Sequence, residues 1–124
     1  MNLEETEMTD EHFEGLKKFK DLPLLDKLIL NRNKLRRFGV IEGFKSLKCL
    51  SLESNLIDVP IAISELSKLG TLEYFNIKHN PIGDMLGQAY VRQRSVSELP
   101  KLKWINNSDL KKYERKDYEI YYMR

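Results

Sequence analysis

The sequence is poor in the residues from which metal sites and many catalytic sites are built. Among 124 residues it has one cysteine, Cys49, and two histidines, His12 and His79. A single cysteine excludes an intrachain disulfide framework, and neither histidine has cysteines or carboxylates around it at metal-ligand spacing. The six glycines are scattered, so the sequence predicts no glycine-rich phosphate loop. We therefore expect a protein that is not an enzyme and that holds no metal and no cofactor.

Long apolar runs are also missing. No stretch approaches the roughly 20 apolar residues that cross a bilayer. The first ten residues, MNLEETEMTD, are acidic and polar, unlike a secretory signal peptide. These features predict one domain in the cytosol or the nucleus, without contact to a membrane.

Charge is unevenly distributed along the chain. Residues 1–14 hold six acidic residues and no lysine or arginine, which leaves 21 basic against 13 acidic residues in the remainder. That remainder would attract an acidic partner, and its densest basic cluster is Arg32, Lys34, Arg36 and Arg37. Because no aromatic residues are interleaved with the cluster, RNA binding by base stacking is not indicated. The simpler interpretation is solvated loop charge behind a loose acidic leader.

A leucine and asparagine pattern recurs three times. The copies are LDKLILNRNKL (residues 25–35), LKCLSLESNLI (47–57) and LEYFNIKHNPI (72–82). Each fits L-x-x-L-x-L-x-x-N-x-L, with other apolar residues at some leucine positions. The asparagines Asn33, Asn55 and Asn80 are 22 and 25 residues apart. This is the leucine-rich-repeat signature.

The repeat predicts an α/β fold: a right-handed leucine-rich-repeat solenoid with a curved parallel β-sheet, short convex-side helices and a C-terminal helical cap. Each L-x-L centre is a short strand with inward leucines. We expect each repeat asparagine to bond backbone groups that the following turn leaves unpaired, which is a structural role.

The chain divides into three expected parts. Residues 1–12 form the acidic leader, and residues 13–98 hold about three and a half repeats with an N-terminal covering helix in EHFEGLKKFK (residues 11–20). Residues 99–124 hold a degenerate last repeat and the cap helix, which we expect to begin at Ser108 or Asp109. A further helix is expected within residues 87–100.

Residues between the inward leucines should line the concave side of the sheet. Stacking predicts one cross-strand row of Lys27, Cys49, Tyr74 and Trp104, a second of Ile29, Ser51, Asn76 and Asn106, and a third of Asn31, Glu53 and Lys78. Tyr74 and Trp104 would be neighbours, and exposed aromatic residues often anchor interfaces. We predict a protein-binding face formed by Lys27, Ile29, Asn31, Ser51, Glu53, Tyr74, Asn76, Lys78 and Trp104. The alternative is that Trp104 packs under the terminal helix, with Tyr74 leaning on it.

The closing stretch RQRSVSELPKLKWINNSDLKKYERKDYEIYY, residues 92–122, resembles the end of the leucine-rich-repeat domain of tubulin-specific chaperone E (tubulin folding cofactor E) and its cofactor-E-like relative. The family's cap motif is similar at Arg92, Asn106, Glu114, Arg115, Glu119 and Tyr122. The resemblance implies a protein-binding scaffold that assists folding, assembly or dissociation of the αβ-tubulin heterodimer. The family has more repeats, a ubiquitin-like domain and usually a CAP-Gly domain. We therefore expect either a fragment of such a protein or a shorter protein that shares the cap.

Partners implied by this resemblance are α- or β-tubulin and other tubulin cofactors, in the cytoplasm near the cytoskeleton. Two other classes stay open. One is a leucine-rich subunit of an RNA–protein complex, like the spliceosomal A-prime protein, which would use the basic cluster near Arg36. The other is a phosphatase-regulatory leucine-rich protein.

Overall fold

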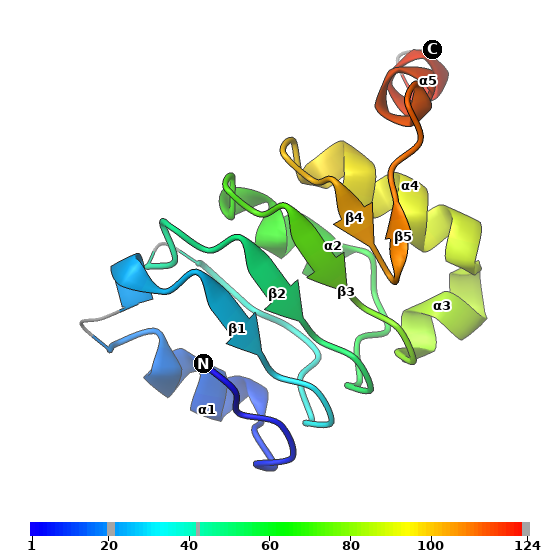
Figure 1. Cartoon of the computed structure of the whole chain (residues 1–124). Coiled ribbons are helices and arrows are strands. Elements are labelled where there is room, and N and C mark those ends of the chain that lie inside the picture. The colour runs from blue at the N-terminus through cyan, green and yellow to red at the C-terminus, as the bar shows by residue number, and fades with distance from the viewer. Residues whose placement is uncertain (20–21, 42, 123–124) are drawn as a thin grey trace.

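The computed structural model describes residues 1–19, 22–41 and 43–122, and for residues 120–122 it describes the backbone alone. The chain contains short helices and short strands (Figure 1). Their order is α1 (Asp10–Leu16), η1 (Leu22–Leu24), β1 (Lys27–Ile29), β2 (Cys49–Ser51), α2 (Ile61–Glu65), η2 (Leu66–Lys68), β3 (Tyr74–Asn76), α3 (Pro81–Leu86), α4 (Gln88–Glu98), β4 (Trp104–Ile105), β5 (Ser108–Asp109) and α5 (Glu114–Tyr122). None of the helices within the described residues is long and apolar enough to span a membrane.

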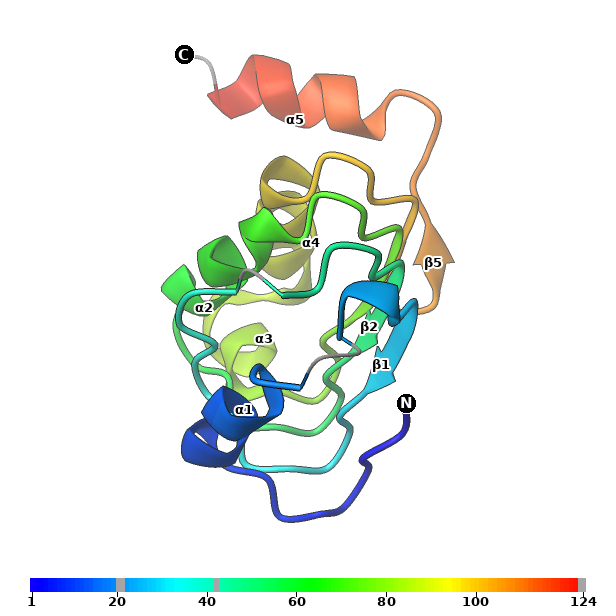
Figure 2. The same cartoon turned by 90° about the vertical axis from the view of Figure 1, so that its left-hand side faces the viewer.

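One sheet joins all five strands in the order β1-β2-β3-β4-β5. The pairs β1–β2, β2–β3 and β3–β4 are parallel, whereas β4 and β5 are antiparallel. Helices α1 to α4 lie on one side of the sheet, and no helix of the described residues lies on the other side (Figure 2). We call this second side, lined by the residues that alternate with the inward leucines, the open face. The predicted α/β class and parallel sheet are confirmed.

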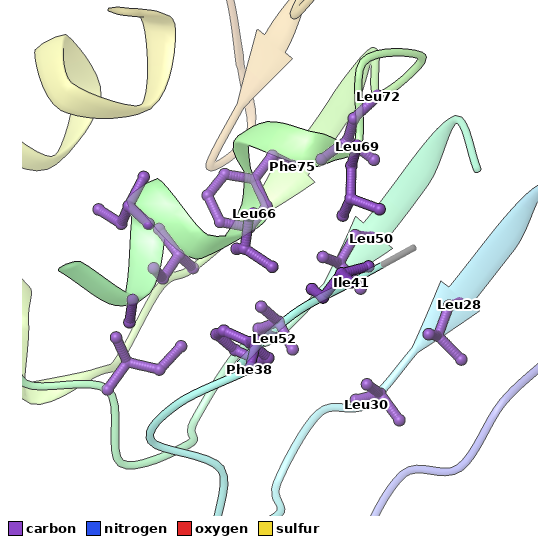
Figure 3. Close-up of a cluster of buried hydrophobic side chains, with 14 of the residues drawn as sticks. Leu28, Leu30, Phe38, Ile41, Leu50, Leu52, Leu66, Leu69, Leu72 and Phe75 are labelled. Carbon is purple, nitrogen blue, oxygen red and sulfur yellow. The ribbon is translucent and has the colours of Figure 1, made fainter. Parts of the chain in front are cut away.

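Strand alternation places the repeat leucines in the core. The central residues Leu28, Leu50, Phe75 and Ile105 are in register across β1 to β4 and are at most 3% exposed. Figure 3 shows the strand residues meeting apolar side chains from the helix side, such as Phe38 and Leu66. Burying an aliphatic or aromatic side chain of this size stabilises a fold by about 1.5–3 kcal/mol. The core therefore fixes which residues face outward on β1 to β4.

The turn after each strand has the same geometry in the three repeats. The residue before each repeat asparagine is left-handed, with φ of 56° at Arg32, 58° at Ser54 and 56° at His79. This conformation turns the chain sharply away from the sheet at the same place in each repeat. Equivalent strands are thereby brought into register.

The buried asparagine amides join consecutive turns. Asn55 Nδ2 donates to the carbonyl oxygens of Leu30 (2.9 Å) and Leu52 (3.1 Å), and its Oδ1 accepts from the Leu35 amide (3.1 Å). Asn80 bonds in the same way to Leu52, Ile77 and the amide of Ile57. Each side-chain amide forms hydrogen bonds with backbone groups of two repeats, so it links neighbouring turns.

The predicted helices are found with shorter bounds. The helix expected over residues 11–20 is α1, which ends at Leu16 and buries Phe13 and Leu16; residue 20 lies outside the described residues. The helix expected within residues 87–100 is α4.

The predicted start of the C-terminal helix is wrong. Ser108 and Asp109 do not cap a helix but form β5, which pairs back onto Trp104 and Ile105. Asn106 and Asn107 have φ of 52° and 75°, which makes a two-residue hairpin turn of the type that asparagine favours. The helix itself, α5, begins six residues later than Ser108, and residues 123 and 124 of the predicted helix lie outside the described residues.

Candidate protein-binding face

A groove crosses the open face over β1 to β4. Its outward-facing lining residues are Lys27, Ile29, Cys49, Ser51, Tyr74, Asn76 and Trp104. The observed register pairs Lys27 with Cys49, Cys49 with Tyr74, and Tyr74 with Trp104. The predicted first row is therefore confirmed as a row of cross-strand neighbours.

Tyr74 and Trp104 form the aromatic part of the groove. They are direct partners on β3 and β4; Tyr74 is 45% exposed and Trp104 is half-buried. Because their strands are paired, their backbones lie about 4.8 Å apart. Both side chains line the same groove. The pair presents an apolar surface to the solvent beside polar groups on β2 and β3.

Hydrogen bonds hold that polar part in place. Ser51 Oγ donates to Asn31 Oδ1 (2.7 Å), and Asn76 Nδ2 donates to Ser51 Oγ (3.1 Å). Asn76 Oδ1 in turn accepts from the Lys78 amide (3.1 Å). The chain of bonds fixes three polar side chains across β1, β2 and β3. Asn106, at the start of the hairpin turn, lies beside Asn76 in the second predicted row: its amide donates to the Phe75 carbonyl (3.0 Å) and its Oδ1 accepts the Ile77 amide (2.8 Å).

The third row carries charge. Lys78 Nζ lies 3.5 Å from Glu53 Oε1, which confirms the predicted pair, and His79 Nε2 lies 3.7 Å from the same oxygen. Asn31 joins the row by accepting the Glu53 amide at 3.0 Å. An ion pair at such a half-exposed position contributes little stability by itself. Both side chains remain partly exposed on the open face.

Cys49 does not have the environment of a reactive thiol. It is half-buried in the middle of the groove. Burial raises the pKa of the Cys49 thiol; the nearby Lys27 lowers it and Asp26 raises it further. A raised pKa keeps the sulfur protonated near neutral pH, which makes it a poor nucleophile.

The basic cluster after β1 is largely neutralised within the chain. Arg32 pairs with Glu5 at 3.2 Å and Arg36 with Asp58 at 2.6 Å. The guanidinium of Arg37 bonds both carboxylate oxygens of Glu65, at 2.8 and 3.0 Å. Glu65 also accepts the amides of Phe38 (3.1 Å) and Gly39 (3.1 Å), so it anchors the loop on α2. The sequence did not indicate these pairs, whose members are 22 to 28 residues apart.

At the other end of the sheet, Arg92 in α4 bonds Glu114 in α5 through two nitrogens, and its NH2 group donates to the Asp109 carbonyl (2.7 Å). Glu114 is 7% exposed and also accepts the Tyr118 hydroxyl and the Lys111 amide. The hydrogen bond from Arg92, with further bonds from Tyr118 and Lys111, lowers the pKa of Glu114 to about 2, although burial opposes this. Burial and the adjacent Glu114 carboxylate raise the pKa of Tyr118 to about 12. The carboxylate is therefore charged throughout the physiological range.

The other residues of the predicted cap motif lie at three separate places. Arg115 donates to the carbonyl oxygens of Val96 (2.6 Å), Leu99 (3.0 Å) and Leu102 (3.1 Å), which connects α5 to the end of α4 and the turn before β4. Asn106 Oδ1 accepts the Ile77 amide at 2.8 Å. Glu119 is exposed on α5, and the side chain of Tyr122 lies outside the described residues. Tyr118, absent from the predicted motif, completes the Arg92–Glu114 cluster.

Metal ligands are not gathered anywhere in the described residues: no group of three or more histidine, cysteine, aspartate or glutamate side chains is placed to hold an ion. The face described above instead offers aromatic, amide and charged groups on a rigid sheet. Such a surface suits contact with another macromolecule.

The parallel strands are followed by equivalent turns, in which a buried asparagine makes the same hydrogen bonds. This arrangement defines a leucine-rich-repeat protein. No family model matches the chain. Among curated proteins, the chain is 32% identical to "Tubulin-folding cofactor E" of Arabidopsis thaliana over its whole length, which covers 25% of that protein. It is 31% identical to "Tubulin-specific chaperone E" of Xenopus laevis, over 83% of this chain and 21% of that protein. The chain thus resembles the leucine-rich-repeat domain of tubulin cofactor E, and it spans about a quarter of the length of these curated relatives.

Solved structures support the fold. A chain in the crystal structure of the Drosophila melanogaster SNF/U2A′ complex superposes with a TM-score of 0.74 and 21% identity, over 83% of this chain and 59% of that chain. The structure of the Chaetomium Mex67:Mtr2 subunits gives a TM-score of 0.67 and 18% identity, over 94% of this chain and 85% of that chain. At these identities the likeness concerns the fold alone.

Proposed function

We propose that the chain is a protein-binding module of a tubulin-specific chaperone of the cofactor E type, which assists folding, assembly or dissociation of the αβ-tubulin heterodimer. Its partner is α- or β-tubulin, another tubulin cofactor, or both, and it works in the cytoplasm close to the cytoskeleton. The module binds and does not catalyse a reaction. Support comes from the two curated relatives, which are named as a tubulin-folding cofactor and a tubulin-specific chaperone.

The observation that carries the proposal is the aromatic pair on the open face. Tyr74 and Trp104 are neighbouring residues on β3 and β4 and line a groove that none of the described helices covers. Tyrosine and tryptophan are enriched among the residues that dominate binding energy, because they bury large surfaces at little cost in side-chain entropy. Hydrogen bonds already immobilise Ser51 and Asn76 beside them, so a partner would meet a preorganised surface.

The architecture that we propose is a right-handed solenoid with the open face on its concave side. In this arrangement α5 closes the last repeat. Arg92 and Glu114 support the proposal because they join α5 to α4, and Arg115 supports it by bonding three carbonyl groups next to the last parallel strand. The cap would keep β4 in place beneath a bound partner.

Nucleic acid is the less favoured partner. An RNA-binding role would use the cluster Arg32, Lys34, Arg36 and Arg37, yet three of these four side chains are engaged in ion pairs with acidic residues of the same chain. Binding phosphate there would require those pairs to open. The fold likeness to a chain of the SNF/U2A′ complex carries no partner with it at 21% identity.

A pull-down with immobilised protein tests the proposal, with αβ-tubulin and a structured RNA offered separately. We expect the wild-type chain to retain tubulin and the double variant Tyr74→Ala/Trp104→Ala to lose it. Tyr113→Ala removes another exposed tyrosine, 61% exposed against 45% for Tyr74, just before α5; it is the control and is expected to bind normally. Circular dichroism verifies that each variant is folded. Retention of RNA with a steep salt dependence, and no retention of tubulin, would refute the proposal.

A further inference from the structure

The acidic leader is not loose in the structure but lies beside β1 as an additional parallel segment. The Leu3 amide donates to the Ile29 carbonyl (2.8 Å), and the Glu5 amide donates to the Asn31 carbonyl (3.1 Å). Asn2 forms a parallel bridge with Ile29. The leader therefore covers the edge that β1 would otherwise expose.

Each of these leader contacts has a counterpart between true repeats. The same two amide-to-carbonyl bonds connect β1 to β2 and β2 to β3: Leu30 to Ser51 and Arg32 to Glu53, then Leu52 to Asn76 and Ser54 to Lys78. By this correspondence Leu3 stands where Leu30 and Leu52 stand. Glu5 stands where Arg32 and Ser54 stand, and it shares their left-handed backbone, with φ of 54°.

Thr6 then occupies the position of the repeat asparagine. Its hydroxyl donates to the carbonyl of the residue three places earlier, Leu3, at 2.9 Å. Asn33 makes the same bond through Nδ2 to Leu30, at 3.0 Å. A threonine hydroxyl can supply this one donor, although it cannot supply the second donor of an amide group.

Asn33 forms the same hydrogen bonds with the leader that Asn55 forms with the preceding repeat. Its Nδ2 donates to the Leu3 carbonyl (2.9 Å), and its Oδ1 accepts the Met8 amide (2.8 Å). Asn55 makes the equivalent bonds, to the Leu30 carbonyl and the Leu35 amide. Leu3 packs against the core and Met8 is only 9% exposed, so their side chains also take the inward repeat positions.

We propose that residues 1–8 belong to a further leucine-rich repeat, with L-x-x-T-x-M in place of L-x-x-N-x-L, and that Asn2 and Glu4 extend the open face by one repeat. Asn2 continues the row of Ile29, Ser51 and Asn76 through its bridge to Ile29. Its Oδ1 accepts the Glu4 amide at 3.0 Å, as Asn76 Oδ1 accepts the Lys78 amide at 3.1 Å. The extension of the partner-binding surface rests on the proposed function, whereas the repeat assignment does not.

Replacing Thr6 by asparagine or by aspartate tests the repeat assignment. The two residues have nearly the same shape, but only asparagine can donate to the Leu3 carbonyl. We expect Thr6→Asn to unfold at the wild-type temperature or above it, and Thr6→Asp to unfold about 3–5 °C lower. Repeating both melts in 1 M salt screens repulsion from Glu5 and Glu7. Equal melting temperatures of the two variants under that condition would overturn the assignment.

Two charge reversals test the extension of the open face. Glu4→Lys changes a residue of the extended face, and Glu11→Lys makes the same change on α1, on the helix side of the sheet. We expect Glu4→Lys to change the Kd for αβ-tubulin at least threefold and Glu11→Lys to leave it unchanged. If the two variants bind alike while Tyr74→Ala/Trp104→Ala does not bind, the extension is wrong and the proposed function stands. If the wild-type chain binds no tubulin, the proposed function and the extension fail together, and the Thr6 comparison still decides the repeat assignment.

Discussion

Arg92 and Glu114 form a two-point ion pair between α4 and α5, with one guanidinium nitrogen 3.0 Å from its carboxylate oxygen and the second in closer contact. The carboxylate is 7% exposed, and its other bonds come from Tyr118 and the backbone of Lys111. A buried carboxylate with this many donors is satisfied only while both helices stay in place. The pair therefore couples the position of α5 to that of α4.

Removing the charge of Glu114 should weaken this coupling. Glu114→Gln keeps the size of the side chain but loses the ion pair and leaves Arg92 without its counter-ion. We expect the free energy of unfolding to fall by about 2–3 kcal/mol, measured by urea denaturation. Glu119→Gln, an exposed glutamate on the same helix, is the control and should change it by less than about 0.5 kcal/mol. Equal effects of the two substitutions would show that the ion pair contributes nothing specific.

Stability should depend on pH through the same residue. The pKa of Glu114 is lowered from 4.5 in the unfolded chain to about 2 in the folded chain, so the unfolded state binds the proton more tightly. The stabilisation is therefore complete above pH 4.5 and is lost as the pH falls towards 2. We expect the difference in melting temperature between wild type and Glu114→Gln to shrink steadily across that interval. A melting-temperature difference that stays constant from pH 6 to pH 2.5 would contradict a lowered pKa of Glu114.

The repeat asparagines should be costly to replace. Asn55→Ala removes two donors and one acceptor that serve the buried backbone groups of Leu30, Leu52 and Leu35. We expect a loss of about 2–4 kcal/mol in chemical denaturation, since buried groups are left without partners. Asn76→Ala is the comparison, because Asn76 is half-buried and lies on the open face; its loss should be about 1 kcal/mol. Similar losses of unfolding free energy at both positions would argue that the buried amide does not link neighbouring turns.

Two substitutions in the β4–β5 hairpin should change the melting temperature in opposite directions. Asn107→Gly places glycine at a left-handed position whose side chain is exposed, and it should raise the melting temperature by about 1–3 °C. Asn106→Gly relieves the same kind of strain but deletes the bond to the Ile77 amide, and it should lower the melting temperature. Thermal unfolding followed by circular dichroism distinguishes them. A raised melting temperature of Asn106→Gly would mean that the hydrogen bond to the Ile77 amide does not stabilise the fold.

The sequence predicted the sheet well because its signals are local and repeated. Leucines in L-x-L fix which side of each strand is buried, and the asparagine spacing fixes how far the chain travels before it pairs again. The row through Tyr74 and Trp104 follows from those two facts. The pair of Glu53 and Lys78 follows as well, because both residues sit at the same position in consecutive repeats.

Other features depended on signals that the repeat pattern does not contain. The leader lacks an asparagine at residue 6, so Thr6 did not match the repeat and the segment was expected to be loose. Ser108 and Asp109 are residues that often cap the start of a helix. The preceding Asn106-Asn107 pair favours a tight hairpin turn, and the structure forms the hairpin. The partnership of Arg37 with Glu65 joins segments 28 residues apart and cannot be inferred from spacing.

The most direct test of the account is the equilibrium Kd of the purified chain for αβ-tubulin, measured side by side for wild type, Tyr74→Ala/Trp104→Ala and Tyr113→Ala. If the aromatic pair anchors the partner on the open face, the double variant should bind at least about 30-fold more weakly, which corresponds to roughly 2 kcal/mol, and Tyr113→Ala should match wild type. Wild-type affinity in a folded double variant, or no affinity in the wild-type chain, would contradict the account.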